Sequence, residues 1–571
     1  MGRTRRSLVA ATLTLVMIAT GGTLWLLHAN AWGLGGRSPV LNYDTSQYAL
    51  AARELASHGR LATTFALPLE LSRHARPPWP LAVVQPGLVL VEAAIFKLAP
   101  REASLGGRQL AHLYRPDERE WLVLLLPILC YLAIATLLAF AASRLLRRHA
   151  PDLPGPRRTA AAFTLGFMFL LDPEAQHFAT SGFTELPFTL GLLAAVVGLA
   201  FGWAPRRPLL FGLLLGVTGS FRANMLWLAP VLALAAAMLA PRGRRLRVLV
   251  FALSGCVLPL VPWWWYKWRA FGSPSWDLTR FVVWDGVEGR TWFSLYHLPE
   301  LPPLPAGFAA AKLLAAKTLR NLPALLLASL TGPRALWLGA IVAWLVALRP
   351  PRALAVPALA VLAAFGLSLA LAAVSIPWLR YVFPARVACE AAGLLALWAL
   401  VARLQPPVAP AAAARALHIV AALLALGWGG FQSARANAEA AATSQERGVP
   451  GTLTLLQISV LMNREIPAGE PVMSNLGPAL AWQARRPVLH LALSPGDLES
   501  CRRRLEFRHV LLVFRDPSRA WPGWTEVVAH PEQAVRNPEW NLARVRVWRS
   551  EDGFSLVWFE LGPPAVRLAE R

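Results

Sequence analysis

The sequence predicts an α-helical polytopic membrane protein with a small C-terminal α/β domain. Of its 571 residues, 56% are hydrophobic and only 15% are charged. A soluble protein could not cover so much apolar surface, so this composition indicates a chain embedded in a membrane. The apolar residues form long runs up to about residue 440, and beyond it the composition becomes mixed.

The net charge of +24 comes from 56 lysines and arginines against 32 aspartates and glutamates. Such an excess can mark a nucleic-acid-binding protein. Here, however, the arginines gather in short loops between apolar runs, as they do in the cytoplasmic loops of membrane proteins. We therefore expect no nucleic-acid partner, and we assign each loop to a side of the membrane from its arginines.

The first apolar run, Leu8–Leu27, follows Arg3, Arg5 and Arg6. This pattern resembles a secretory signal, but an apolar core of about 20 residues is longer than a signal peptide usually has. We expect an uncleaved helix with a cytoplasmic N-terminus. Cleavage would leave the next segment on the same, extracytoplasmic side.

The run Leu81–Leu98 is ambiguous. Its Pro86, Glu92 and Lys97 make a deep span through lipid costly. If the run did cross, the arginine-rich loop 144–158 would lie outside, against the positive-inside tendency. We expect a helix at the outer interface of the membrane, so that residues 29–119 form one large extracytoplasmic loop.

The remaining runs alternate with basic loops and predict about eleven transmembrane helices within residues 1–440. Their odd number places the C-terminus outside the cytoplasm. Besides Leu8–Leu27, the predicted runs are Trp121–Ala142, Thr159–Leu171, Phe183–Trp203, Leu209–Phe221, Ala223–Leu239, Leu246–Trp263, a run ending near Leu348, Ala353–Val374, Tyr381–Val401 and Ala411–Gly430.

Residues 441–571 read as a small extracytoplasmic α/β domain. Short β-rich runs alternate with helix-like pieces, which is typical of this class. The expected strands are Val472-Met473, Val488–Leu493, His509–Phe514, Val545–Trp548 and Phe554–Phe559, and the expected helices are Pro478–Ala484 and Pro495–Leu505.

The chemistry is expected in the first large loop. Asp44 lies just past the first membrane exit, and a predicted helix follows it with Tyr48, Ala52 and Leu55 at helical spacing. The order of Asp44, Tyr48, Ala52-Arg53-Glu54-Leu55, Gly59 and Arg76-Pro77-Pro78 resembles the first loop of multi-spanning glycosyltransferases that use polyprenyl-phosphate sugars. Protein O-mannosyltransferases and the lipid A aminoarabinose transferase are members of this group. Thr45 stands where the family usually has a second acid.

The resemblance implies a GT-C type fold and a specific reaction. A sugar would pass, with inversion, from a polyprenyl-phosphate donor to a glycolipid, cell-envelope polysaccharide or protein. The enzyme would be a multi-pass protein of the inner or plasma membrane, in contact with its lipids, and its active site would lie outside the cytoplasm. The sequence identifies neither the sugar nor the acceptor.

Three acids are candidates for the catalytic site. Asp44 is the expected general base, although a solvated loop carboxylate or a helix N-cap would also suit its place. Glu185, in a Phe-Thr-Glu-Leu-Pro element similar to one in the family, would orient the acceptor or share a cation with Asp44. The structural alternative is that Glu185 is a first-turn carboxylate favoured by the helix dipole. Glu70 is a weaker second acid. A divalent metal is compatible with the larger fold, but Thr45 argues against a paired-acid site and no metal ligands are assigned.

Cationic side chains should receive the donor phosphate, because a guanidinium matches phosphate oxygens in a bidentate way. The alternative for each arginine is snorkelling to lipid headgroups. The candidates are Arg76, Arg222, Lys267 and the Arg380-Tyr381 pair, whose Arg-Tyr-x-x-Pro pattern resembles a family element. Tyr48, His74 and Glu70 are expected to position the substrate.

Two other functions compete with the glycosyltransferase. A lipid or glycan transporter would place ionisable residues within the spans and would show inverted repeats. The candidate residues here lie at the predicted outer ends of the spans instead, and the sequence shows no repeat. A non-catalytic membrane assembly protein would keep the fold and lose the activity, which the Thr45 replacement leaves open.

The odd number of spans predicts that the C-terminus lies outside the cytoplasm. A reporter enzyme that is active only in the cytoplasm should therefore give no signal when fused after residue 571. A reporter that is active only outside should give a strong one. The opposite pair of signals in whole cells would contradict the arginine-based topology.

Overall fold

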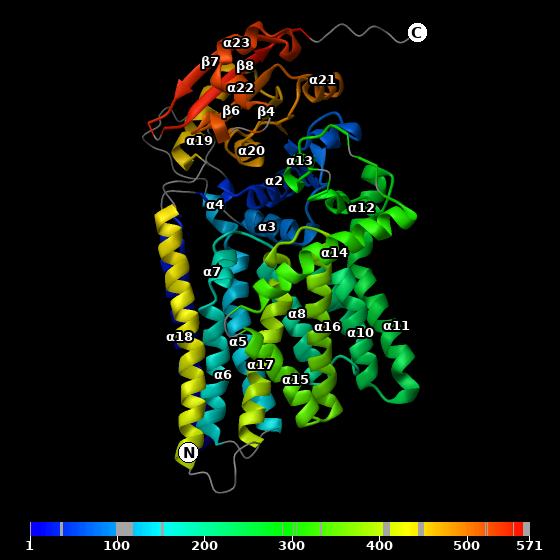
Figure 1. Cartoon of the computed structure of the whole chain (residues 1–571), viewed down its shortest axis with the longest axis vertical. Helices are drawn as coiled ribbons and strands as arrows, with labels where there is room; N and C mark the ends of the chain where they lie inside the picture. Colours follow the sequence, from blue (N-terminus) through cyan, green and yellow to red (C-terminus); the bar gives the residue numbers. More distant parts are fainter. Residues whose placement is uncertain are drawn as a thin grey trace.

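The structure is a computed structural model in which helices run side by side in a bundle and a mixed α/β region is stacked on one end of it (Figure 1). It describes residues 2–34, 38–98, 118–149, 154–287, 289–300, 302–303, 305–331, 334–403, 411–443, 450–519, 521, 523–551 and 553–563. Residues 99–117 of the predicted first loop lie outside this part of the chain.

Each predicted apolar run falls on a helix of the bundle. These helices are α1 (Gly2–Ala31), α5 (Leu125–His149), α6 (Gly155–Leu170), α8 (Glu185–Ala200), α9 (Pro208–Phe221), α10 (Met225–Leu239), α11 (Arg245–Val257), α15 (Arg334–Ala347), α16 (Arg352–Val374), α17 (Phe383–Arg403) and α18 (Ala411–Thr443). Among the described residues, five helices are long and apolar enough to cross a membrane, or up to six if a bent pair counts as one span. The chain is thus a multi-pass membrane protein, and the number of about eleven spans stays a prediction.

Helices α8, α9 and α10 are shorter than a full membrane span. They have 16, 14 and 15 residues, whereas a helix needs about 20 to cross the hydrocarbon core. Their ends at Glu185, Phe221 and Met225 adjoin the cavity described below. The bundle is therefore hollowed where polar residues gather.

Helices α2 (Tyr43–His58) and α3 (Pro86–Leu98) lie across the end of the bundle beneath the mixed region (Figure 1). Helix α12 (Val261–Phe271) continues the helical stretch that begins at Arg242. Helix α3 occupies most of the ambiguous run. At the start of α2, the side chain of Asn42 accepts a hydrogen bond from the backbone N–H of Asp44, at 3.1 Å. Asn42 is thus the N-cap, and the alternative that Asp44 caps this helix is wrong.

The mixed region is built on a six-stranded sheet of order β2-β5-β4-β6-β8-β7. Its strands are β2 (Phe65–Ala66), β4 (Val472–Ser474), β5 (Val488–His490), β6 (His509–Phe514), β7 (Leu542–Arg549) and β8 (Ser555–Leu561). All five expected C-terminal strands are present, as are the expected helices, α20 (Gly477–Ala484) and α21 (Pro495–Arg504). Strand β2 was not expected, because it comes from the first loop and pairs in parallel with β5.

A buried polar contact joins the first loop to the C-terminal region. Arg53 of α2 donates to the carbonyl oxygens of Trp482 at 2.9 Å and Ala481 at 3.3 Å, and its guanidinium stacks 4.4 Å from the Trp482 ring. The indole of Trp482 donates in turn to the carboxylate of Glu120, at 3.0 Å. The Arg53 bonds satisfy carbonyl groups at the end of α20 that lack partners within the helix. They also fix α2, which carries Asp44, against the sheet region.

Helices α9 and α11 approach so closely that only glycine fits between them. A Cβ atom at Gly212 would lie 2.1 Å from the carbonyl oxygen of Ala252, and one at Gly255 would lie 2.4 Å from that of Leu209. Because both obstacles are backbone atoms, a side chain there would push the helices apart. Small residues allow such close approach in membrane bundles.

We expect Gly212→Ala to lower the free energy of unfolding by about 1–3 kcal/mol, the usual cost of overpacking a core. Thermal unfolding of the protein in detergent measures the effect. Gly339→Ala is the matched control, because a Cβ there meets nothing within 4 Å and alanine is the better helix former. A wild-type melting temperature for Gly212→Ala would contradict this packing.

Candidate active site

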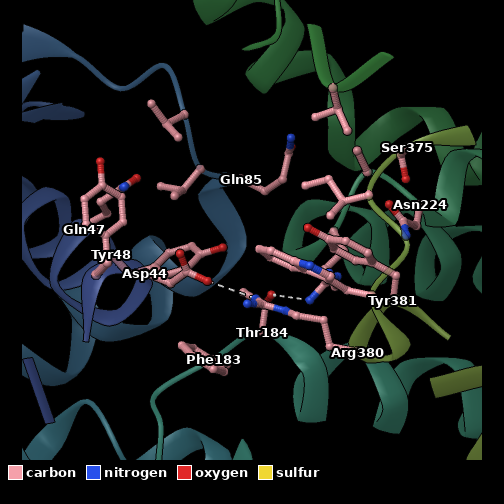
Figure 2. A pocket seen from close by; sticks show the side chains of 18 of the residues that line it. Asp44, Gln47, Tyr48, Gln85, Phe183, Thr184, Asn224, Ser375, Arg380 and Tyr381 are labelled. Carbon is pink, nitrogen blue, oxygen red and sulfur yellow. Dashed lines mark hydrogen bonds and ion pairs between the residues drawn. The ribbon is translucent and has the colours of Figure 1, made fainter. Parts of the chain in front are cut away.

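A cavity of about 690 Å³ lies between the end of the bundle and the C-terminal region. Its walls come from parts of the chain that are distant in sequence. The start of α2 and the segment 83–85 supply one side, and residues 221–227 and 371–381 supply the bundle side. Asn475, His490 and Trp521 close it from the C-terminal region. Figure 2 shows Asp44 and Tyr48 on one side of the cavity and Arg380 and Tyr381 facing them.

Four charged residues form one ionic cluster at this cavity. Arg380 reaches Asp44, with Nη2 2.9 Å from Oδ2, and Glu185, with Nε 2.8 Å from Oε1. Arg222 lies on the other side of Glu185, with Nη1 2.5 Å from the same Oε1. Its guanidinium also donates to the hydroxyl of Thr184, at 3.4 Å. The structure thus brings together four residues that the sequence predicted separately.

Burial divides the two acids of the cluster into different roles. The side chain of Glu185 is 0% exposed, whereas that of Asp44 is 39% exposed and lines the cavity. A buried carboxylate is costly unless it is paired, and Glu185 is paired twice. Glu185 therefore organises the arginines, and Asp44 is the acid that a molecule in the cavity would meet.

Arg380 belongs to the short 3₁₀ turn η8 (Leu379–Tyr381), just before α17. Burial opposes the charge of its guanidinium, but the carboxylates of Glu185 and Asp44 outweigh burial and hold the pKa of Arg380 above its usual range. Aromatic rings fix the planes of both arginines. Arg380 lies 4.9 Å from the Phe183 ring, and Arg222 lies 5.2 Å from the Tyr381 ring. These are cation–π distances.

Tyr48 also lines the cavity, one helical turn after Asp44. Burial, helped by the carboxylate of Asp44, raises the pKa of Tyr48 above its usual range. The phenol thus stays protonated at physiological pH and is a hydrogen-bond donor beside the acid. The placement agrees with the substrate-positioning role predicted for it, which stays a prediction.

Four other predicted site residues lie outside the cavity. Arg76 is exposed, and Lys267 Nζ pairs with Asp277 at 3.1 Å. His74 Nε2 lies 2.5 Å from the carbonyl oxygen of Ala270, and Oε1 of the Glu70 carboxyl accepts a hydrogen bond from the backbone N–H of Leu67, at 3.1 Å. The contacts of Lys267, His74 and Glu70 lie within the first loop and between it and the segment around α12, and the substrate roles of all four residues stay predictions.

Thr45, at the position of the family's usual second acid, faces away from the cavity. Its hydroxyl donates to the carbonyl oxygen of Ser181, and its methyl group lies against Gly182. Both residues belong to the loop between α7 (Pro173–Ala179) and α8. The side chain at position 45 therefore ties α2 to the loop that precedes Glu185.

Several cavity residues were not predicted. Tyr43 and Gln47 had a signal, because they share the helical face of Asp44 and Tyr48, and Asn224 adjoins Arg222 in the apolar stretch. His490, Asn475 and Tyr296 had none, because only the packing of the C-terminal region over the bundle brings them to the cavity. Within the described parts of the chain, no group of three or more histidine, cysteine, aspartate or glutamate side chains could hold a metal ion.

No protein-family model matches this sequence, and a search of curated proteins finds no match. Solved structures do match. The crystal structure of ArnT from Cupriavidus metallidurans bound to undecaprenyl phosphate aligns over 95% of this chain and 97% of its own, with 15% identity and a TM-score of 0.52. Its apo structure aligns over 96% and 98%, with 13% identity and a TM-score of 0.50. The chain therefore has the GT-C type of fold with a small C-terminal sheet region, as predicted.

Glu70 makes the stability of the first loop depend on pH. Burial, partly offset by the hydrogen bond from the Leu67 N–H, raises the pKa of its carboxyl from the usual 4.5 to about 8. Between these two values the folded state binds more protons than the unfolded state. Stability should therefore fall as the pH rises from about 4.5 to about 8, and then level off.

Melting temperatures measured across this pH window test the effect. In Glu70→Gln, which keeps the shape and the acceptor oxygen, the fall should be markedly smaller than in the wild type. Arg76→Gln is a suitable control, because Arg76 is exposed in the same loop and arginine does not titrate in this pH window. An identical pH profile for the wild type and Glu70→Gln would contradict the buried neutral carboxyl.

Proposed function

We propose that the chain is a glycosyltransferase that takes a sugar from a polyprenyl-phosphate donor and passes it to an acceptor outside the cytoplasm. One observation carries the proposal: two arginines and an accessible carboxylate meet at a cavity whose bundle side is apolar. Phe221, Trp227, Leu371 and Val374 line that side. The fold shared with ArnT, whose crystal structure holds undecaprenyl phosphate, supports a lipid-phosphate ligand.

Arg380 and Arg222 are the proposed phosphate contacts. The donor is a phosphodiester with one negative charge, and the departing lipid phosphate carries a second. Charge-assisted contacts that strengthen as this charge develops lower the barrier. Both guanidiniums are already held by Glu185 and by aromatic rings, so little reorganisation accompanies phosphate binding.

Asp44 is the proposed general base. The acceptor O–H or N–H attacks the anomeric carbon, the bond from this carbon to the phosphate oxygen breaks, and the acceptor proton passes to Asp44. A single displacement of this kind inverts the anomeric configuration. Asp44 is accessible from the cavity and lies 2.9 Å from the Arg380 guanidinium, so the proposed base and the proposed phosphate contact are neighbours. Glu185 is fully buried, so its proposed role is to position the two arginines.

The location of the reaction is part of the same proposal. The protein would lie in the inner or plasma membrane with the cavity end of the bundle outside the cytoplasm, and the arginine-rich loops support this orientation. The acceptor is a glycolipid, a cell-envelope polysaccharide or a protein that reaches this side. Its identity and that of the sugar need a substrate screen, for which the release of polyprenyl phosphate from a panel of polyprenyl-phosphate sugars is a general readout.

We expect Asp44→Asn to lower turnover by about 10²–10⁴-fold, the usual contribution of a general base. Asparagine keeps the shape and hydrogen bonding of the residue but removes its basicity. The variant should melt like the wild type, because Asp44 is partly exposed and lies at the start of a capped helix. Glu54→Gln on the same helix is the matched control for turnover.

Three results would count against this assignment. Near-normal turnover of Asp44→Asn would remove it as the base, and a product with retained configuration would require a nucleophile instead. If Glu185→Gln stayed folded and lost more activity than Asp44→Asn, the base would move to Glu185. Failure of the wild type to consume any donor in the panel would contradict the proposed function itself.

A further inference from the structure

Helix α14 (Gly307–Ser329) supplies no residue to the cavity lining, yet three of its side chains hold two segments that do. Lys317, Arg320 and Asn321 lie within about one helical turn of one another. They reach the turn η7 (Leu278–Trp284) with the residues after it, and the C-terminal end of α16. Val282, Val374 and Ser375 of these segments line the cavity.

The ammonium of Lys317 has three hydrogen-bond acceptors, and all are backbone carbonyl oxygens. Its Nζ lies 2.9 Å from the oxygen of Ser375, 3.1 Å from that of Val283 and 3.2 Å from that of Val282. Lys317 is 2% exposed. Three acceptors saturate the three N–H groups of an ammonium, so in this arrangement the lysine serves the backbone and has no N–H left for a ligand.

These acceptors include the end of α16. The last carbonyls of a helix lack intrahelical partners, and a cation near them is favoured by the helix dipole. Lys317 binds the carbonyl of Ser375, and the Asn321 amide donates to that of Ala373, at 2.9 Å. These two side chains of α14 therefore cap the C-terminal end of α16.

The cap lies five residues before Arg380. At the other end of the segment 375–380, the side chain of Arg380 is held by Glu185 and Asp44. If a phosphate takes Arg380 over from Asp44, one of these two ties is lost. The backbone of residues 375–380 must then keep its position through its own anchors, and Lys317 is the anchor that joins it to η7.

We propose that Lys317 is a positioning residue, which acts through Arg380 by fixing the segment 375–380 while Arg380 exchanges Asp44 for a phosphate. The phosphate part of this inference rests on the proposed function. The anchoring part does not, because it depends only on the hydrogen bonds from Lys317 to the carbonyl oxygens.

Hydrogen–deuterium exchange and lipid binding test the two parts in the full-length protein in detergent. Lys317→Met keeps the length of the side chain and removes its donors, and Lys312→Met is the control, because Lys312 is exposed on the same helix. In Lys317→Met, the amides of residues 375–382 should exchange at least about tenfold faster than in the wild type, whereas Lys312→Met should leave them unchanged. Asn321→Ala, a milder change at the same cap, should give a smaller increase and replaces Lys317→Met if that variant does not fold.

Undecaprenyl phosphate is the probe for binding. Lys317→Met should weaken its affinity about tenfold and should add nothing to the loss caused by Arg380→Ala. Lys317→Arg should restore part of the affinity, because it can donate to the same carbonyls. A purely structural role would instead lower the melting temperature and weaken binding equally in the wild-type and Arg380→Ala backgrounds, and this would overturn the proposal.

Unchanged exchange in Lys317→Met would also overturn it. If the wild type did not bind undecaprenyl phosphate at all, the proposed function would fail. The exchange measurement would still decide whether Lys317 anchors the segment that carries Arg380.

Discussion

The buried carboxylate of Glu185 is the constraint on which the site depends. It is removed from water, so it must be paired, and a single oxygen meets both Arg380 and Arg222. The three residues come from the start of α8, the end of α9 and the turn before α17. Their pairing therefore fixes where these elements end, and it holds both guanidiniums at the cavity that Asp44 of α2 also lines.

Placing Asp44 opposite Arg380 requires a second part of the fold. Helix α2 lies outside the bundle, and its position is fixed by contacts with the C-terminal region, above all the Arg53 bonds to the end of α20 and the pairing of β2 with β5. Thr45 adds a tie to the loop before α8. The sheet region is thus part of the support of the site as well as one wall of the cavity.

The sequence predicted those features that depend on neighbouring residues: the helices, the strands and the single charged residues of the site. Apolar runs located the helices, alternation located the C-terminal strands, and Asp44, Glu185, Arg222 and Arg380 each stood out beside an apolar run. Contacts between residues that are distant in sequence could not be predicted from it. The sequence did not reveal that Lys267 pairs with Asp277, and β2 is too short to recognise without its partner strand. His490 reaches the cavity only through tertiary packing.

In the proposed reaction, the charges of the cluster change in a coordinated way. At rest, two arginines balance Asp44 and Glu185. When Asp44 takes the acceptor proton it becomes neutral, and its hold on Arg380 weakens just as the departing phosphate gains a second negative charge. The charge of Arg380 then stabilises the leaving phosphate in place of the base. The guanidinium need not move far, because Glu185 still holds its Nε. Proton transfer and leaving-group stabilisation are thus coupled through one guanidinium, which is why the base and the phosphate site lie side by side.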